Sequence, residues 1–240
     1  LKPVSQQTLV GLTVRYDYQN WSWKNLESYE LDGRSPWKSI DSSALGINFT
    51  HRITPEWQAS IVPTIEYSGE SGAKFSNSLT YGAILSASKR FSPDLRLGFG
   101  TGVFRQIDAT KVFPYILVDW KITDRLNLNN PLPAGPAGGA GLELTYSVTP
   151  QFKLSAGGTY RSYRFRLNTN GPYADGVGQN TVFPLFTRFT YAFDRSTALD
   201  LYGIVGVGGK ISATGSSTGQ EFNTAYKNAP AIALSFTKRF

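Results

Sequence analysis

Residues 10–19 read Val-Gly-Leu-Thr-Val-Arg-Tyr-Asp-Tyr-Gln, and this stretch decides the fold class. Apolar or aromatic residues occupy every second position, and small or polar residues lie between them. Because successive side chains of a β-strand point to opposite faces, this period of two predicts a strand with one apolar and one polar face. The stretch also has the length of about ten residues that a tilted strand needs to cross a bilayer.

The same alternation recurs along the chain, in segments separated by two kinds of connection. Apolar residues recur at alternate positions within these ranges: 45–49, 57–65, 79–85, 95–103, 142–148, 152–160, 183–193 and 199–207. Five connections are tight and contain Pro, Asp, Ser or Thr, which favour turns: 53–57, 91–95, 122–126, 148–152 and 193–197. The six others are longer and polar or glycine-rich: 20–43, 68–77, 106–110, 129–140, 167–180 and 209–229.

Tight turns at one end and long loops at the other are typical of outer-membrane β-barrels. Six loops and five turns, with both termini on the turn side, predict about twelve antiparallel strands. Ten is the alternative count, because the segment 126–131 is short and runs into a Pro- and Gly-rich stretch. We therefore predict a single domain over residues 1–240, an all-β, antiparallel, up-and-down transmembrane β-barrel.

The composition distinguishes a membrane β-barrel from a helical membrane protein and from a soluble β-sandwich. Charged residues make up 17% of the chain, against about 25% in soluble domains, and no apolar run approaches the roughly 18 residues of a transmembrane helix. A soluble sandwich would expose a face rich in Lys and Glu, whereas the polar face here is mostly Ser, Thr, Gly and Asn. Aromatic residues concentrate near both ends of the strands, as the two interfacial girdles of a membrane barrel require.

The last nine residues, Ile232-Ala-Leu-Ser-Phe-Thr-Lys-Arg-Phe240, resemble the terminal strand of Gram-negative bacterial outer-membrane β-barrels. The resemblance rests on alternate apolar positions and a final aromatic residue: Ile232, Leu234, Phe236 and Phe240. It implies that these four residues form the signal read by the barrel-assembly machinery. It also implies outer-membrane lipid as surroundings, periplasmic termini and short turns, and extracellular long loops. Lys238 departs from the usual apolar choice, and we interpret it as a residue that snorkels to the interface.

Few residues offer chemistry. The chain has no Cys and one histidine, His51, which stands on the apolar phase without a Ser or Asn at the spacing of a lipase site. We therefore expect no enzymatic activity, no metal and no cofactor. The basic residues are spread along the chain, so we expect no nucleic-acid partner, although the net charge is +7. Leu1 begins the sequence without a signal-like segment, and we expect that a leader has been removed.

The informative set is the charged residues on the polar phase, because charges inside a barrel must pair with one another or face water. The predicted lumen-lining cations are Arg15, Arg52, Arg90, Arg96, Lys121, Lys153, Arg161, Arg188 and Arg239. The predicted lumen-lining anions are Asp17, Glu66, Asp119, Glu143 and Asp200. Glycines on the same phase would leave room for a lumen: Gly98, Gly100, Gly102, Gly157, Gly206 and Gly208. The excess of positive charge predicts a preference for anions, and a packed ionic core is the alternative.

Two functions are consistent with these patterns. The first is a porin-like outer-membrane channel for passive diffusion of small hydrophilic, preferentially anionic solutes. The second is a non-conducting structural or binding barrel that docks a surface partner or joins a larger outer-membrane complex through its long loops. Trp21, Trp23 and Trp37 in the first long loop would serve such docking, or they would fold back over the mouth.

Overall fold

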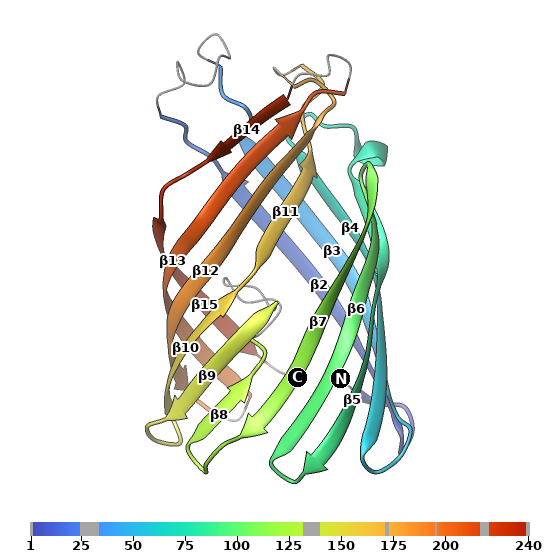
Figure 1. Cartoon of the computed structure of the whole chain (residues 1–240), viewed down its shortest axis with the longest axis vertical. Coiled ribbons are helices and arrows are strands. Elements are labelled where there is room, and N and C mark those ends of the chain that lie inside the picture. The colour runs from blue at the N-terminus through green and yellow to red at the C-terminus, as the bar shows by residue number, and fades with distance from the viewer. Residues whose placement is uncertain are drawn as a thin grey trace.

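A computed structural model describes residues 2–24, 34–131, 140–170, 173–194, 196–216 and 221–238. It confirms an all-β chain folded into one large, curved sheet (Figure 1). The first eight strands are β1 (Lys2–Pro3), β2 (Thr8–Asn20), β3 (Ser39–Arg52), β4 (Trp57–Glu70), β5 (Leu79–Ser92), β6 (Leu95–Gln106), β7 (Ala109–Lys121) and β8 (Leu126–Asn129). The others are β9 (Gly141–Ser147), β10 (Phe152–Thr159), β11 (Arg161–Arg166), β12 (Val177–Ala192), β13 (Thr197–Thr214), β14 (Glu221–Ala225) and β15 (Ala229–Lys238).

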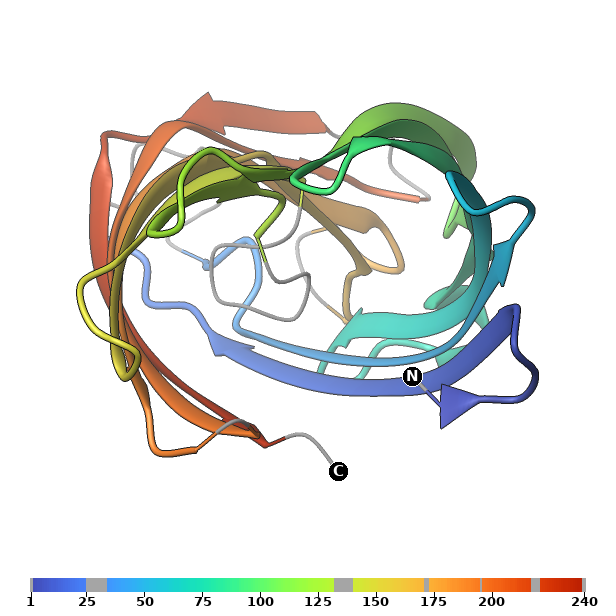
Figure 2. The same cartoon turned by 90° about the horizontal axis from the view of Figure 1, so that it is seen from below.

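Neighbours in the sheet are neighbours in the sequence. The strands pair in order from β1 to β10, followed by β12, β13 and β14, while β11 pairs with β12 and β15 with β13. Every pairing is antiparallel apart from one parallel bridge between Arg166 of β11 and Gly69 of β4. The sheet curves round until β15 and β2 lie on the same side (Figure 2). No backbone pairing between β2 and β15 joins them within the described residues.

The strand segments number fifteen, whereas the alternation predicts about twelve. Three differences account for this. β1 is a two-residue addition at the edge, the strand predicted over 152–160 continues after Tyr160 as β11, and the last strand is interrupted between β14 and β15. Phe240 and Arg239 lie outside the described residues. The other residues of the predicted assembly signal, Ile232, Leu234 and Phe236, are strongly exposed on one face of β15.

All five predicted tight turns are confirmed, each joining two consecutive strands. Three share one device, in which the hydroxyl of Thr54, Thr123 or Thr149 accepts a hydrogen bond of 3.0 Å from the backbone N–H three residues later. In the turn between β12 and β13, Asp194 accepts hydrogen bonds from Ser196 and Thr197. These bonds lower the pKa of Asp194 to about 2.

The two faces of the sheet differ as the alternation predicts. Large apolar side chains such as Val14, Leu85 and Phe189 are exposed on the outer, convex face. The buried residues gather inside, mostly at the loop end, around Trp37 and Phe165. The described residues include no helix with the length and apolar character to cross a membrane. The chain's only regular helical element in this part is a 3-10 turn, Phe75–Asn77.

Candidate functional site

The inner face carries the candidate site, and its charged residues fall into groups with different surroundings. The first group lies on β2 and β4, whose residues Arg15 and Glu66 both stand opposite Ala44 of the strand between them. Arg15 donates a 2.8 Å hydrogen bond to Glu66, and its Nε lies 3.8 Å from Asp17. These three predicted lumen residues are therefore paired with one another.

A second group connects β9, β12 and β13. Glu143 and Asp200 are almost completely buried, with exposed fractions of 1% and 2%. Arg188 lies between them, in an ion pair with Glu143 and 3.8 Å from an oxygen of Asp200, and its guanidinium stands over the ring of Tyr202. Charges that are this buried need their partners. For this group, the packed ionic core that the sequence leaves as the alternative describes the geometry better than charges that face a water-filled lumen.

The third group lies at the turn end and is mostly basic. Arg90 and Arg96 stand directly opposite each other on β5 and β6, and Arg52 is close enough to act electrostatically on Arg96. Arg96 donates to the side chain of Gln58 and stands opposite Asp119 of β7. Like charges directly opposite each other on a sheet repel, so Arg90 and Arg96 do not compensate each other. Together with Arg52, they concentrate positive charge at this end of the inner face.

Three further predicted cations have separate positions. Lys121 pairs with Asp124 in the adjoining turn at 2.6 Å. Lys153 lines a polar pocket of about 660 Å³ at the turn end, together with Arg188 and Asp200. Arg161, on β11, stands with its guanidinium 4.4 Å from the ring centre of Tyr163. The predicted set is thus dispersed over the height of the inner face and does not form a single site.

Aromatic side chains pack together on the inner face at the loop end. Trp21 stacks on Trp23 with ring centres 5.7 Å apart, and both contact the edge of Trp37. Trp37 is buried against Phe165 of β11 at 5.2 Å, and its carbonyl accepts a 2.7 Å hydrogen bond from the indole of Trp23. We call this group, with Leu167, Tyr173 and Phe222, the aromatic cap. Of the two roles considered for the tryptophans, folding back over the mouth is the one that the structure has.

Polar residues that the sequence did not single out hold the cap in place. Glu70 is buried and accepts hydrogen bonds from the backbone N–H groups of Lys38 and Asn168. Arg166 is also buried and donates to the carbonyls of Asn77 and Asp175. Glu70 and Asn168 fall within the predicted loops 68–77 and 167–180, where alternation gives no direction for a side chain. No sequence signal used above could have found these contacts.

Three of the six glycines predicted to face the lumen, Gly100, Gly102 and Gly157, do not leave the room that the alternation suggested. A Cβ at Gly100 would lie 2.3 Å from the ring of Tyr115, and one at Gly102 would lie 2.2 Å from the ring of Phe113. A Cβ at Gly157 would similarly meet the ring of Phe186. At these positions the missing side chain makes space for a neighbouring aromatic ring, so the expectation of an enlarged lumen there was wrong.

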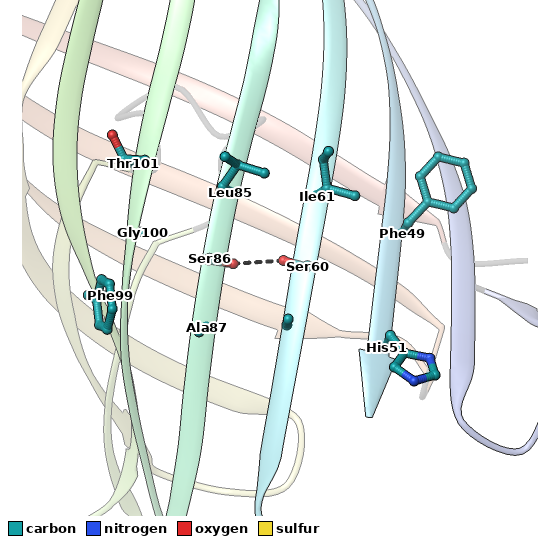
Figure 3. A pocket seen from close by; sticks show the side chains of 11 residues that line it. Phe49, His51, Ser60, Ile61, Leu85, Ser86, Ala87, Phe99, Gly100 and Thr101 are labelled. Carbon is teal, nitrogen blue, oxygen red and sulfur yellow. Dashed lines mark hydrogen bonds between the residues drawn. The ribbon is translucent and has the colours of Figure 1, made fainter. Parts of the chain in front are cut away.

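The outer face has a hollow of about 500 Å³ across β3 to β6 (Figure 3). Phe49 and Phe99 stand at its two sides with Ala87 between them, and Ala59 is also part of its lining. His51 lies at one end, where its Nδ1 is 3.0 Å from the hydroxyl of Thr8. The hollow is apolar, and a hydroxyl–imidazole pair without a third, orienting group lacks the arrangement of a nucleophilic triad.

Within the part of the chain that is described, no three His, Asp or Glu side chains are grouped so as to hold a metal ion. Comparison with curated proteins finds no match. A family model described as a domain of unknown function (DUF6268) matches residues 4–230, from the segment before β2 to the start of β15. Since this match spans nearly all of the sheet and every group of charged residues described above, the chain belongs to the DUF6268 family.

Proposed function

We propose that this protein is a bacterial outer-membrane β-barrel of about twelve strands, among which β8, with four residues, is too short to cross the membrane. The count treats β10 and β11 as one strand and β14 and β15 as another, and it omits the short β1. Large apolar side chains exposed along the outer face support a lipid environment, because water would not favour so large an apolar surface. In this placement the tight turns are periplasmic and the long loops extracellular, and the barrel-assembly machinery inserts the chain.

We further propose that the barrel is a narrow channel that favours small anionic solutes and has no enzymatic role. One observation carries this proposal: Arg52, Arg90 and Arg96 concentrate positive charge at the turn-end mouth, where Asp119 is the neighbouring carboxylate. A positive mouth raises the local concentration of anions and lowers that of cations. The paired groups around Arg15 and Arg188 contribute less to selectivity, because their charges are compensated.

The aromatic cap favours a second candidate, a barrel that does not conduct and instead binds a surface partner. Trp37 and Phe165 are both buried and in contact, so this packing narrows the loop end. If the cap moves, the barrel is a gated channel, and the two candidates describe its open and closed states. An experiment that removes the cap distinguishes a channel from a barrel that never conducts.

The test is single-channel recording in a planar bilayer with a salt gradient. We expect brief or rare steps from the wild type, and larger, longer steps from Trp37→Ala, with a reversal potential directed toward anions in both. Replacing Arg52, Arg90 and Arg96 by Ser should shift this potential toward zero. Arg105→Ser is the matched control, because Arg105 is an exposed residue of the same strand as Arg96 on the opposite phase. Silence from a folded wild type and a folded Trp37→Ala variant would remove the channel and leave the binding barrel.

A further inference from the structure

The backbone ladder is interrupted between β7 and β11. β7 pairs with β6 over its whole length, but it pairs with β8 only at residues 119–121. β11 pairs with β12, and on its other side it meets β4 through Arg166 alone. Within the described part of the chain, residues 109–118 of β7 therefore have no strand partner on the side of β11, and Figure 1 shows the two strands bordering a gap. We call this interruption the window.

Side chains clamp the window at both ends. At the loop end, Arg164 of β11 reaches Asp108, in the turn between β6 and β7, with hydrogen bonds of 2.7 to 3.1 Å to both carboxylate oxygens. Toward the turn end, the side-chain amide of Asn130 bonds the N–H of Val118 and the carbonyls of Ile116 and Gly141. An added strand from another chain would have to break both clamps, so the window suits a small ligand better than a protein edge.

A pocket of about 850 Å³ occupies the window. Its lining is largely apolar, with Phe113, Ile116, Leu142 and Tyr160 contributed from both sides. Lys111 is the one charged residue among those that line it, and within the described residues this lysine has no hydrogen bond or ion pair. Alkyl chains fit apolar linings of this kind, and an uncompensated ammonium complements an anionic head group.

The exposed edge of β7 adds a second requirement for a polar group. Backbone N–H and C=O groups without partners are costly at membrane depth, and open sheet edges are not left against lipid. Asn130 satisfies this requirement only at its own end of the window. A ligand with an acidic head and an apolar tail would place hydrogen-bond acceptors beside the N–H groups of this edge nearest Lys111 and would cover the apolar walls.

We infer that the window binds a single-chain anionic amphiphile, of the class of long-chain carboxylates, that enters sideways from the membrane. The carboxylate lies at Lys111, and the alkyl chain lies against Phe113, Ile116 and Tyr160. The inference rests on the proposed membrane location but not on conduction through the barrel.

The test is equilibrium binding of radiolabelled dodecanoate to the full-length protein in micelles of a neutral detergent, with dodecanol as the uncharged counterpart. Lys111→Gln should weaken dodecanoate binding about tenfold, since a hydrogen bond to a charged group is lost, and should leave dodecanol binding unchanged. Lys210→Gln, which removes an exposed strand lysine outside the window, should change neither.

A second variant and photolabelling of the binding site test where the ligand binds. Ser162→Trp places a large side chain in the pocket lining and should abolish binding while the heat-modifiable migration of the folded barrel persists. A photoreactive dodecanoate should label peptides from β7 and β10–β11. Labelling confined to the outer hollow near Ala87, equal binding of dodecanoate and dodecanol in all variants, or no saturable binding would each overturn the inference. The variant lacking Arg52, Arg90 and Arg96 should still bind dodecanoate, so failure of the channel is distinguishable from failure of the window.

Discussion

Arg188 illustrates how much a single residue of the inner face depends on its partners. It lies between two carboxylates that are almost inaccessible to solvent, Glu143 and Asp200. Glu143→Gln removes the ion-pair partner of Arg188 and leaves Asp200 at 3.8 Å. We expect the free energy of unfolding to fall by about 3 kcal/mol, because a buried charge loses its compensation.

Urea unfolding of the protein in lipid vesicles, followed by tryptophan fluorescence, measures this change. Glu221→Gln is the matched control, because Glu221 is exposed at the start of β14, and it should alter stability by less than about 0.5 kcal/mol. Equal stability of the two variants would mean that Arg188 is compensated by Asp200 alone.

The sequence predicts which face of the sheet a charged side chain lies on, but it does not predict the partner of that side chain. Alternation put Arg15, Glu66, Glu143, Arg188 and Asp200 on one phase, and in the structure they make the ion pairs of the inner face. It could not tell a lone cation from a paired one, because pairing depends on the register between strands and on side-chain reach. It also could not foresee that Tyr115 fills the space beside Gly100.

At the scale of elements, the window makes β7 an edge strand over most of its length, while β6 has neighbours on both sides. In an antiparallel pair, alternate residues bond to the strand on either side. Every second amide of residues 109–117 should therefore exchange with deuterium much faster than its neighbours, whereas the amides of β6 should be uniformly slow.

Amide exchange of the protein in micelles, resolved by NMR or by fragmentation mass spectrometry, distinguishes these patterns. β6 is the internal control, since it lies beside β7 and has a partner strand on both sides. Uniformly slow exchange along β7 would show that its edge is paired, and the window would then not exist in solution.

The tight turns between strands were the most predictable part of the fold, and the position of β11 was the least predictable. All five tight turns follow from local residue chemistry, such as the Thr54 hydroxyl bonding the backbone of Trp57. The departure of β11 toward β4 does not, because alternation specifies which way a residue faces and carries no information on which strand lies beside it. The window and the packing of Trp37 on Phe165 both depend on the position of β11. Folding back of the tryptophans was one of the sequence-based expectations, but the sequence could not name Phe165 as their partner, and the window was not foreseen.

For the whole molecule, the central question is which solvent surrounds the outer face. Leu85 lies in the middle of β5 and is 44% exposed. If lipid surrounds it, Leu85→Arg should cost about 2–4 kcal/mol of stability in vesicles, and Phe91→Arg, near the turn end, should cost at most about 1 kcal/mol. A soluble protein would tolerate both changes equally, because both side chains are exposed.

The bridge between Arg166 and Gly69 has a consequence for how the molecule reaches its native state. The nearby bond between Glu70 and Asn168 joins residues 98 positions apart, whereas the tight turns join residues that are neighbours in the chain. Contacts of such long range are the slow ones to form, because the intervening chain must first be ordered. We therefore expect the tight turns to form first and the contacts between β4 and β11 at the loop end to form last.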